Sequence, residues 1–184
     1  MFGLGFAIYA TLTSTYNQLV QLDEAVKTQL AQVASVYQRR ADLIPNLVAT
    51  VKGEANFEQE TLQKVIEARA SATQLRVDVN NAQDLAKYQS AQGELSQALG
   101  RLMMITENYP TLQANQAFSD LRVQLEGSEN RISVERMNYN KTVQNYNIKL
   151  RSFPTNLIAE WFGFEKATAF EAQAGSEVAP QVEL

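Results

Sequence analysis

The 184-residue sequence contains no cysteine and no histidine. Disulfides, thiol nucleophiles, Ser-His-Asp or Cys-His catalysis and an ordinary zinc site all need one of these two residues. A di-iron site of the kind found in helical bundles is also disfavoured, because it uses Glu-x-x-His pairs. We therefore expect a non-enzymatic protein that holds no metal and no cofactor.

Basic runs, glycine and proline are scarce as well. The net charge is −4, and no cluster of Lys or Arg provides the positive patch that binding to a nucleic acid needs. Only 8 glycines and 4 prolines occur, whereas helix-forming residues such as Gln, Ala, Leu and Glu are frequent. This composition is typical of a protein built from long helices.

The apolar run at the N-terminus is short. It reads MFGLGFAIYATL, and the first charged residue of the chain is Asp23. Crossing a bilayer takes about 20 apolar residues, and no Lys or Arg precedes the run to make it a signal peptide. We expect residues 1–13 to be the C-terminal part of a membrane anchor that is truncated or short. The alternative is a helix end that packs against a partner protein or another copy.

Apolar residues recur every seven positions from Leu19 onward, which indicates a long helix that ends near Lys52. One row of this helix comprises Leu19, Val26, Val33, Arg40 and Leu47. Pro45 leaves the row in phase on both sides, so we expect a kink in the helix and not a break. At the kink the carbonyl of Ala41 loses its helical partner, because proline has no N–H.

The clearest heptad repeat marks a second long helix near the C-terminus. Its row comprises Phe118, Leu125, Ile132, Tyr139, Tyr146 and Phe153. Within it the triplet Asn-Tyr-Asn occurs twice, at 138–140 and 145–147. We expect the tyrosine rings to pack between helices and Asn140 and Asn147 to hydrogen-bond across the helix pair. A ladder that stacks on a bound ligand is the alternative.

Two shorter helices are predicted between these long ones. The first opens at Asn56 and carries an apolar face as far as Val79, and the second carries one from Leu85 to Ile105. Short connections make neighbouring helices antiparallel. We therefore predict an all-α fold, an elongated antiparallel up-down-up-down four-helix bundle with long first and fourth helices. The bundle domain spans residues 14–165, and residues 166–184 are expected to form a flexible tail.

The stretch RRADLIPNLV at 39–48 places several polar side chains in the first long helix. Antiparallel pairing of the two long helices brings Arg40 level with Glu129, so we predict a contact between these side chains. Arg39, Asp42 and Asn46 share another face of the same helix. They are expected to form a polar network that braces the kink, and the alternative is a site for a small ligand.

Apolar side chains also gather after Pro154. They are Leu157, Ile158, Trp161, Phe162, Phe164 and Phe170. Two interpretations remain open for this cluster: a lid over the open end of the bundle, or a segment at a membrane interface. Because Lys166 is the only basic residue among them, we favour the lid.

Six segments of the sequence, in order, resemble those of the bacterial LemA family. They are YNQLVQLDEAV (16–26), YQRRADLIPNLVATVKGEA (37–55), VIEAR (65–69), ENYPTLQANQAF (107–118), SENRISVERMNYNKTVQNYN (128–147) and FPTNLIAEWFGF (153–164). The resemblance implies a helical bundle tethered by one N-terminal membrane helix. It also implies an accessory protein at a membrane, because some members occur beside membrane zinc-metalloprotease genes or with membrane-organelle assembly.

No catalytic residues are established for this family, so the resemblance transfers none to this chain. The residues that match the family motifs are candidates for structural or interaction roles. They are Arg39, Arg40, Asp42, Pro45, Asn46, Glu107, Tyr109, Pro110, Glu129, Asn130, Arg136, Tyr139, Asn140, Tyr146 and Asn147.

The expected function is that of a non-enzymatic helical scaffold, held at the bacterial membrane by a single-pass anchor. Its expected partners are membrane or envelope proteins, with a membrane metalloprotease system as one candidate, and the lipid bilayer itself. One alternative is a self-assembling oligomeric module. Another is a small-ligand sensor that uses Arg39, Asp42 and Asn46.

Overall fold

The computed structural model describes residues 2–54, 57–75 and 77–171. Over these residues the chain forms six helices and no strand. Their bounds are α1 (Phe2–Lys52), α2 (Gln59–Gln74), α3 (Ala82–Thr106), α4 (Pro110–Gln113), α5 (Gln116–Arg151) and α6 (Thr155–Phe162). The all-α class predicted from the sequence is therefore confirmed.

The helix bounds differ from the prediction at the C-terminal end of α2. Helix α2 ends at Gln74, so Val79 is buried from the connection to α3 and not from a helix. The predicted cap at Asn56 lies outside the described residues. Asn81 caps α3, where its side-chain oxygen accepts hydrogen bonds from the backbone N–H groups of Gln83 and Asp84.

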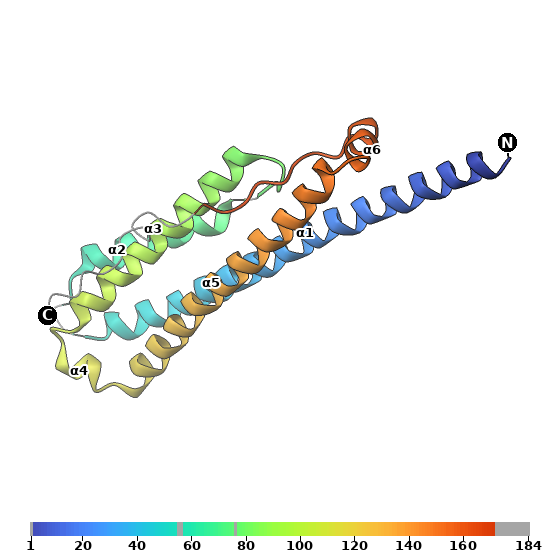
Figure 1. Cartoon of the computed structure of the whole chain (residues 1–184). Coiled ribbons are helices and arrows are strands. Elements are labelled where there is room, and N and C mark those ends of the chain that lie inside the picture. The colour runs from blue at the N-terminus through green and yellow to red at the C-terminus, as the bar shows by residue number, and fades with distance from the viewer. Residues whose placement is uncertain (1, 55–56, 76, 172–184) are drawn as a thin grey trace, which may run out of the picture.

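Helices α1 and α5 lie side by side along much of their length, as Figure 1 shows. They run in opposite directions, because Gln29 of α1 contacts Glu135 of α5, whereas Arg40, further along α1, contacts Glu129, earlier in α5. Helices α2 and α3 pack on one another, and α2 also contacts α1. The N-terminal part of α1 extends past the end of α5 (Figure 1).

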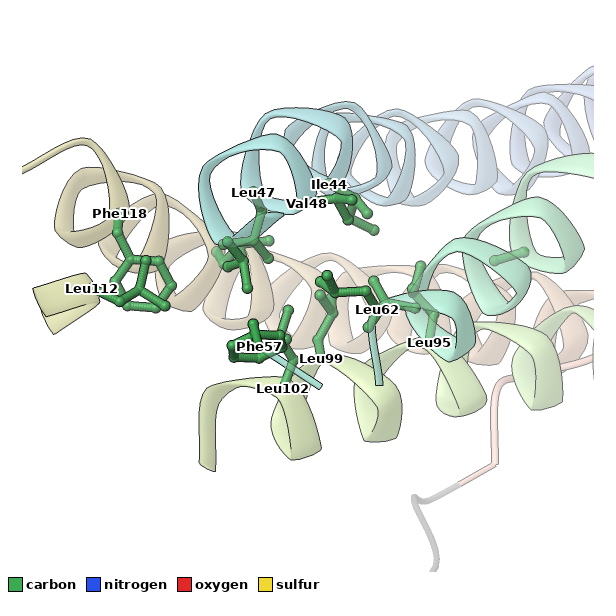
Figure 2. Packing of buried hydrophobic residues seen from close by; sticks show 14 of the residues in the cluster. Ile44, Leu47, Val48, Phe57, Leu62, Leu95, Leu99, Leu102, Leu112 and Phe118 are labelled. Atoms are coloured by element: carbon green, nitrogen blue, oxygen red, sulfur yellow. The ribbon is translucent and has the colours of Figure 1, made fainter. Parts of the chain in front are cut away.

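The core forms two clusters of buried apolar side chains along the molecule. One cluster contains residues of each helix from α1 to α5. Figure 2 shows Leu47, Leu62 and Leu99 within it, with Leu112 of α4 and Phe118 of α5. The second cluster lies nearer the N-terminus of α1. It packs that part of α1 against α5 and the residues after α6.

The heptad rows read from the sequence face this core. Every member of the α1 row from Leu19 to Leu47 is fully buried, including Arg40. In α5 the row from Phe118 to Tyr146 is buried, but its last predicted member, Phe153, is 82% exposed. That part of the prediction is wrong, because α5 ends at Arg151 and the chain turns away before Phe153 reaches the seam.

Pro45 does not interrupt α1, which continues as one helix to Lys52. Pro45 has no N–H to donate to the carbonyl of Ala41. This carbonyl instead accepts a hydrogen bond of 2.8 Å from Nε of Arg69 on α2. A side chain from a neighbouring helix thus replaces the missing backbone donor. The helix that the proline would weaken is fixed to α2 at that point.

We expect Arg69→Met to lower the free energy of unfolding by about 1–2 kcal/mol, because it leaves the buried carbonyl of Ala41 without its donor. In a Pro45→Ala background the same substitution should lower the free energy of unfolding by less, since residue 45 then supplies a helical N–H. Urea unfolding followed by circular dichroism measures the four corners of this double-mutant cycle. Equal costs in both backgrounds would show that Arg69 does not compensate for the proline.

Candidate functional site

The Arg40 guanidinium is fully buried and links four helices. Its Nη1 donates to Oγ of Ser96 on α3 at 2.6 Å and to Oε1 of Glu129 on α5 at 2.5 Å. Its Nη2 donates to the backbone carbonyl of Gln92 at 3.2 Å and to the side-chain Oε1 of Gln92 at 2.7 Å. Gln92 in turn donates from Nε2 to the carbonyl of Ala72 on α2. The contact predicted between Arg40 and Glu129 is confirmed.

Two tyrosines enclose this arginine. The Tyr37 ring lies 5.3 Å from the guanidinium carbon and meets the Tyr88 ring edge-on at 5.5 Å. Burial raises the pKa of both phenols above the ordinary value of tyrosine. Nε of Arg40 has no hydrogen-bond partner. With four of its five donors satisfied and a carboxylate paired to its charge, the arginine fits a structural role.

The other polar residues of this stretch do not join the buried cluster. Arg39, Asp42 and Asn46 are exposed on α1. Asp42 accepts a hydrogen bond from Gln38, one helical turn earlier, and not from Arg39. These three side chains therefore remain on the surface of α1.

The two Asn-Tyr-Asn triplets of α5 bind the extended segment that follows α6. The Tyr139 hydroxyl donates to the carbonyl of Thr168, and the Tyr146 hydroxyl donates to that of Glu165, each at 2.8 Å. Both rings are buried in the core beneath this segment. Burial raises the pKa of each phenol to about 12, so the hydroxyls remain protonated donors well above neutral pH.

The second asparagine of each triplet pairs with one residue of the segment in both directions. Asn147 donates to the carbonyl of Ala167 and accepts from its N–H, at 2.8 and 3.1 Å. Asn140 does the same with Phe170, at 2.9 and 2.8 Å. The expectation that these amides bond across the helix pair is wrong, because their partner is the backbone of residues 164–171. We call this arrangement the amide clamp.

Spacing explains why a heptad repeat can hold an extended chain. Seven residues of α5 rise by about 10.5 Å, and three residues of extended chain cover about 9–10 Å. The two asparagines therefore meet Ala167 and Phe170, three residues apart, whose side chains are buried. In each triplet the first asparagine, Asn138 or Asn145, is exposed.

Further side chains hold the far end of this segment. Gln89 of α3 donates to the carbonyl of Glu171 and accepts from its N–H, at 3.0 and 3.1 Å. Arg136 donates to the same carbonyl and lies 5.1 Å from the Phe170 ring. Residues 166–171, the start of the stretch expected to be a flexible tail, thus pack on α3 and α5. Residues 172–184 lie outside the described residues.

The remaining motif residues lie near or on the connection between α3 and α5. Glu107 ends α3, the Tyr109 ring packs on Phe57 at 4.9 Å, and Pro110 begins α4. Asn130 is exposed on α5. The fifteen residues that match the family motifs therefore lie in or beside four places: the buried arginine cluster, the amide clamp, this connection and the surface.

Sequence reasoning missed the partners that complete these sites. Arg69, Gln89, Gln92 and Ser96 supply hydrogen bonds to α1 or to the C-terminal segment. Only Arg69 carried a signal, because it ends the family motif VIEAR at 65–69. The three polar residues of α3 lie in no such motif.

The end of the molecule opposite α4 exposes large apolar side chains. On α1, Phe6 is 74% exposed and Tyr9 is 66% exposed. On and before α6, Phe153, Leu157 and Trp161 are also exposed. We call these five residues the apolar end. No helix within the described residues is both long and apolar enough to cross a membrane.

The described residues include no group of His, Cys, Asp and Glu that would hold a metal ion. The chemistry that the sites do offer is hydrogen bonding and apolar contact. The amide clamp recognises backbone groups, and the apolar end presents surface that water solvates poorly. Both are features of binding.

Removing the carboxylate from the arginine cluster is expected to destabilise the fold strongly. Glu129→Ala leaves a buried charge without its counter-ion, so the free energy of unfolding should fall by about 3 kcal/mol. Adding Arg40→Met should recover part of this loss. Urea unfolding measures both variants, and Glu126→Ala, in a surface pair with Arg122, is the control with an expected loss below about 0.5 kcal/mol. A Glu129→Ala loss as small as that control would contradict the interpretation.

The triplets provide their own matched test of the amide clamp. We expect Asn140→Ala and Asn147→Ala to speed amide hydrogen exchange in residues 164–171 by about tenfold or more, because each removes two hydrogen bonds to the segment. Asn138→Ala and Asn145→Ala, each two residues away and exposed, should leave exchange unchanged. If all four variants behave alike, the clamp does not hold the segment.

Comparison with known proteins places these features in a family. The LemA family model matches residues 29–184. The chain is 26% identical to Magnetosome protein MamQ 1 of Paramagnetospirillum magneticum over 201 residues, covering 96% of this chain and 73% of that protein. It is 26% identical to Magnetosome protein MamQ of Magnetospirillum gryphiswaldense over 198 residues, with the same two coverages.

A third relative carries the family's own name. The chain is 23% identical over 164 residues to Protein LemA of Metamycoplasma hominis, covering 89% of this chain and 72% of that protein. The resemblance noted on the sequence motifs is thus confirmed by a match over most of the chain. The chain belongs to the LemA family.

Proposed function

We propose that this chain is a non-enzymatic helical scaffold that associates with the bacterial membrane and binds other membrane or envelope proteins there. In this proposal α1, α2, α3 and α5 form an up-down-up-down bundle that is held at the membrane by the N-terminal part of α1. The observation that carries the proposal is the exposure of Phe6 and Tyr9 on a helix that has no charged residue before Asp23.

An exposed apolar helix end of this kind is unfavourable in water. The uncharged start of α1 fits a segment inserted in the membrane, because exposed apolar side chains such as Phe6 and Tyr9 gain free energy from burial in lipid. Membership of the LemA family agrees with this orientation, since the family resemblance implies a membrane helix directly before residue 16. The bundle then extends away from the membrane.

Support for protein partners comes from the exposed face of α5. Val123, Val134, Met137 and Ile148 are exposed and lie 11, 3 and 11 residues apart. Residues at these spacings lie on nearly the same side of a helix with 3.6 residues per turn. An apolar stripe along a long helix is a surface that a second helix can cover. A membrane metalloprotease system is one candidate partner, and a second copy of the chain is the alternative.

The small-ligand sensor gains no support from the geometry. Arg39, Asp42 and Asn46 are exposed on one helix, and Asp42 already has a partner in Gln38. The pocket lined by Leu30, Val77 and Tyr88 has a volume of about 640 Å³ and lies elsewhere along α1. We therefore retain the scaffold.

The test uses the full chain expressed in bacterial cells, with a photo-crosslinking residue at Met137. We expect the parent to sediment with the membrane fraction and Phe6→Asp/Tyr9→Asp to remain soluble, because two charges make burial of this helix end in lipid unfavourable. Val123→Asp/Val134→Asp adds the same charge on the exposed face of α5 and should still sediment. A parent that stays soluble would overturn membrane association.

Illumination of the same membranes tests the protein-binding role. An adduct with a different protein supports the scaffold, and the Val123→Asp/Val134→Asp control should reduce it because it places charge on the stripe. An adduct of twice the mass of the chain supports self-assembly instead. If Met137 yields no adduct, the stripe is not a binding surface and the scaffold role fails.

A further inference from the structure

Helix α6 has one face fixed to the bundle and the opposite face exposed. Thr155, Ile158 and Ala159 are buried against the rest of the chain. Leu157 is 57% exposed and Trp161, one turn later, is 80% exposed. Exposed side chains of this size, gathered on one face of a short helix, mark a contact surface.

The exposed face of α6 cannot turn inward without breaking several contacts. Tyr16 of α1 packs on Phe162 at 4.8 Å and on Phe164 at 5.7 Å. Gly163 ends the helix with φ at 72°, a left-handed conformation that favours glycine. The chain then enters the amide clamp, which holds it to α5. The orientation of α6 is therefore set by contacts on both sides of it.

The contact with Tyr16 also fixes how far α6 lies from the end of α1. Fourteen helical residues separate Phe2 from Tyr16, which is about 21 Å along the helix. The hydrocarbon layer of a bilayer is about 30 Å thick. Asp23, the first charged residue, follows Tyr16 by seven residues, which is about 10.5 Å along the helix. If α1 enters lipid as far as this first charge allows, α6 lies near the level where hydrocarbon gives way to headgroups.

The residue types on and near α6 suit that level. Trp and Tyr are favoured at membrane interfaces because their large rings carry a polar group, and Trp, Phe and Leu form the lipid-facing side of interfacial helices. Lys149 and Arg151 end α5 beside it, and Arg151 lines a groove together with Lys166. Glu160 and Glu165 offset two of these three positive charges, so apolar contact should contribute more than attraction to anionic lipid.

We propose that α6 is an interfacial membrane helix, with Phe153, Leu157 and Trp161 at the boundary between headgroups and acyl chains of the bilayer that α1 enters. The inference rests on the proposed membrane association and adds a second lipid contact to it. Two contacts at different places on the bundle restrict its tilt and its rotation on the membrane. The bundle thus presents a defined side, including the stripe on α5, to its partners.

Trp161 is the only tryptophan of the chain, so the fluorescence of the unmodified protein reports on α6. The full chain is mixed with vesicles of phosphatidylethanolamine and phosphatidylglycerol that carry a bromine label either near the headgroup or at the end of the acyl chain. We expect the emission to shift to shorter wavelength and to be quenched more by the label near the headgroup. Sedimentation of the same samples measures binding.

The combined outcomes separate the inference from the proposed function. Protein that does not sediment with vesicles overturns both. Protein that sediments while Trp161 emission stays unshifted and unquenched overturns only the interfacial helix. A blue shift that follows protein concentration without vesicles shows that a second copy covers α6, and it also overturns the inference.

A paired variant tests the other two residues and keeps the reporter. We expect Phe153→Asn/Leu157→Asn to lower vesicle affinity about tenfold or more and to reverse the shift of Trp161, because two large side chains leave lipid. Met104→Asn/Val123→Asn changes two exposed apolar residues away from α6 and should bind like the parent. Equal affinity of both variants would overturn the lipid contact of α6.

Discussion

The buried guanidinium of Arg40 is the constraint on which the arrangement of the helices depends. A charge in the interior must be neutralised and hydrogen-bonded, and no side chain of α1 does this. The carboxylate comes from Glu129 on α5, and further acceptors come from Gln92 and Ser96 on α3. Shifting either helix by one turn would separate these groups. Apolar side chains specify such a register less strictly, because each needs only another apolar side chain as its neighbour.

The same requirement, that buried polar groups find partners, recurs in two other places. Pro45 leaves a carbonyl of α1 without a helical donor, and Arg69 of α2 supplies one. The segment after α6 has no secondary structure to satisfy its backbone, and the amides and hydroxyls of α5 do so. In each case a backbone group that has no local hydrogen-bond partner is bonded by a side chain from a distant segment. Together these contacts place α6 beside α1, where the proposed membrane surface forms.

Whereas polar groups form hydrogen bonds inside the bundle, several large apolar side chains are exposed on its surface. Those of α1 and α6 gather at one end, and those of α5 follow one stripe. The fold could have buried Trp161 by rotating α6, but the Tyr16 contact and the amide clamp fix the opposite face inward. In the proposed function the start of α1 meets lipid and the stripe on α5 meets protein, and the further inference adds α6 to the lipid contact. The rigid interior then matters because it sets the angle between these two surfaces.

The sequence by itself determined the helices, because a heptad period is a local property that any fold of the chain must respect. It also determined the pairing of Arg40 with Glu129, since two long antiparallel helices of known ends admit few registers. It did not determine the role of Asn140 and Asn147. Their partner, the segment around Ala167, has no period and lies 20 residues after Asn147 and 30 residues after Asn140 at the paired positions. Only the tertiary structure decided where that segment lies, because hydrogen bonds to backbone groups leave no pattern in the residues that receive them.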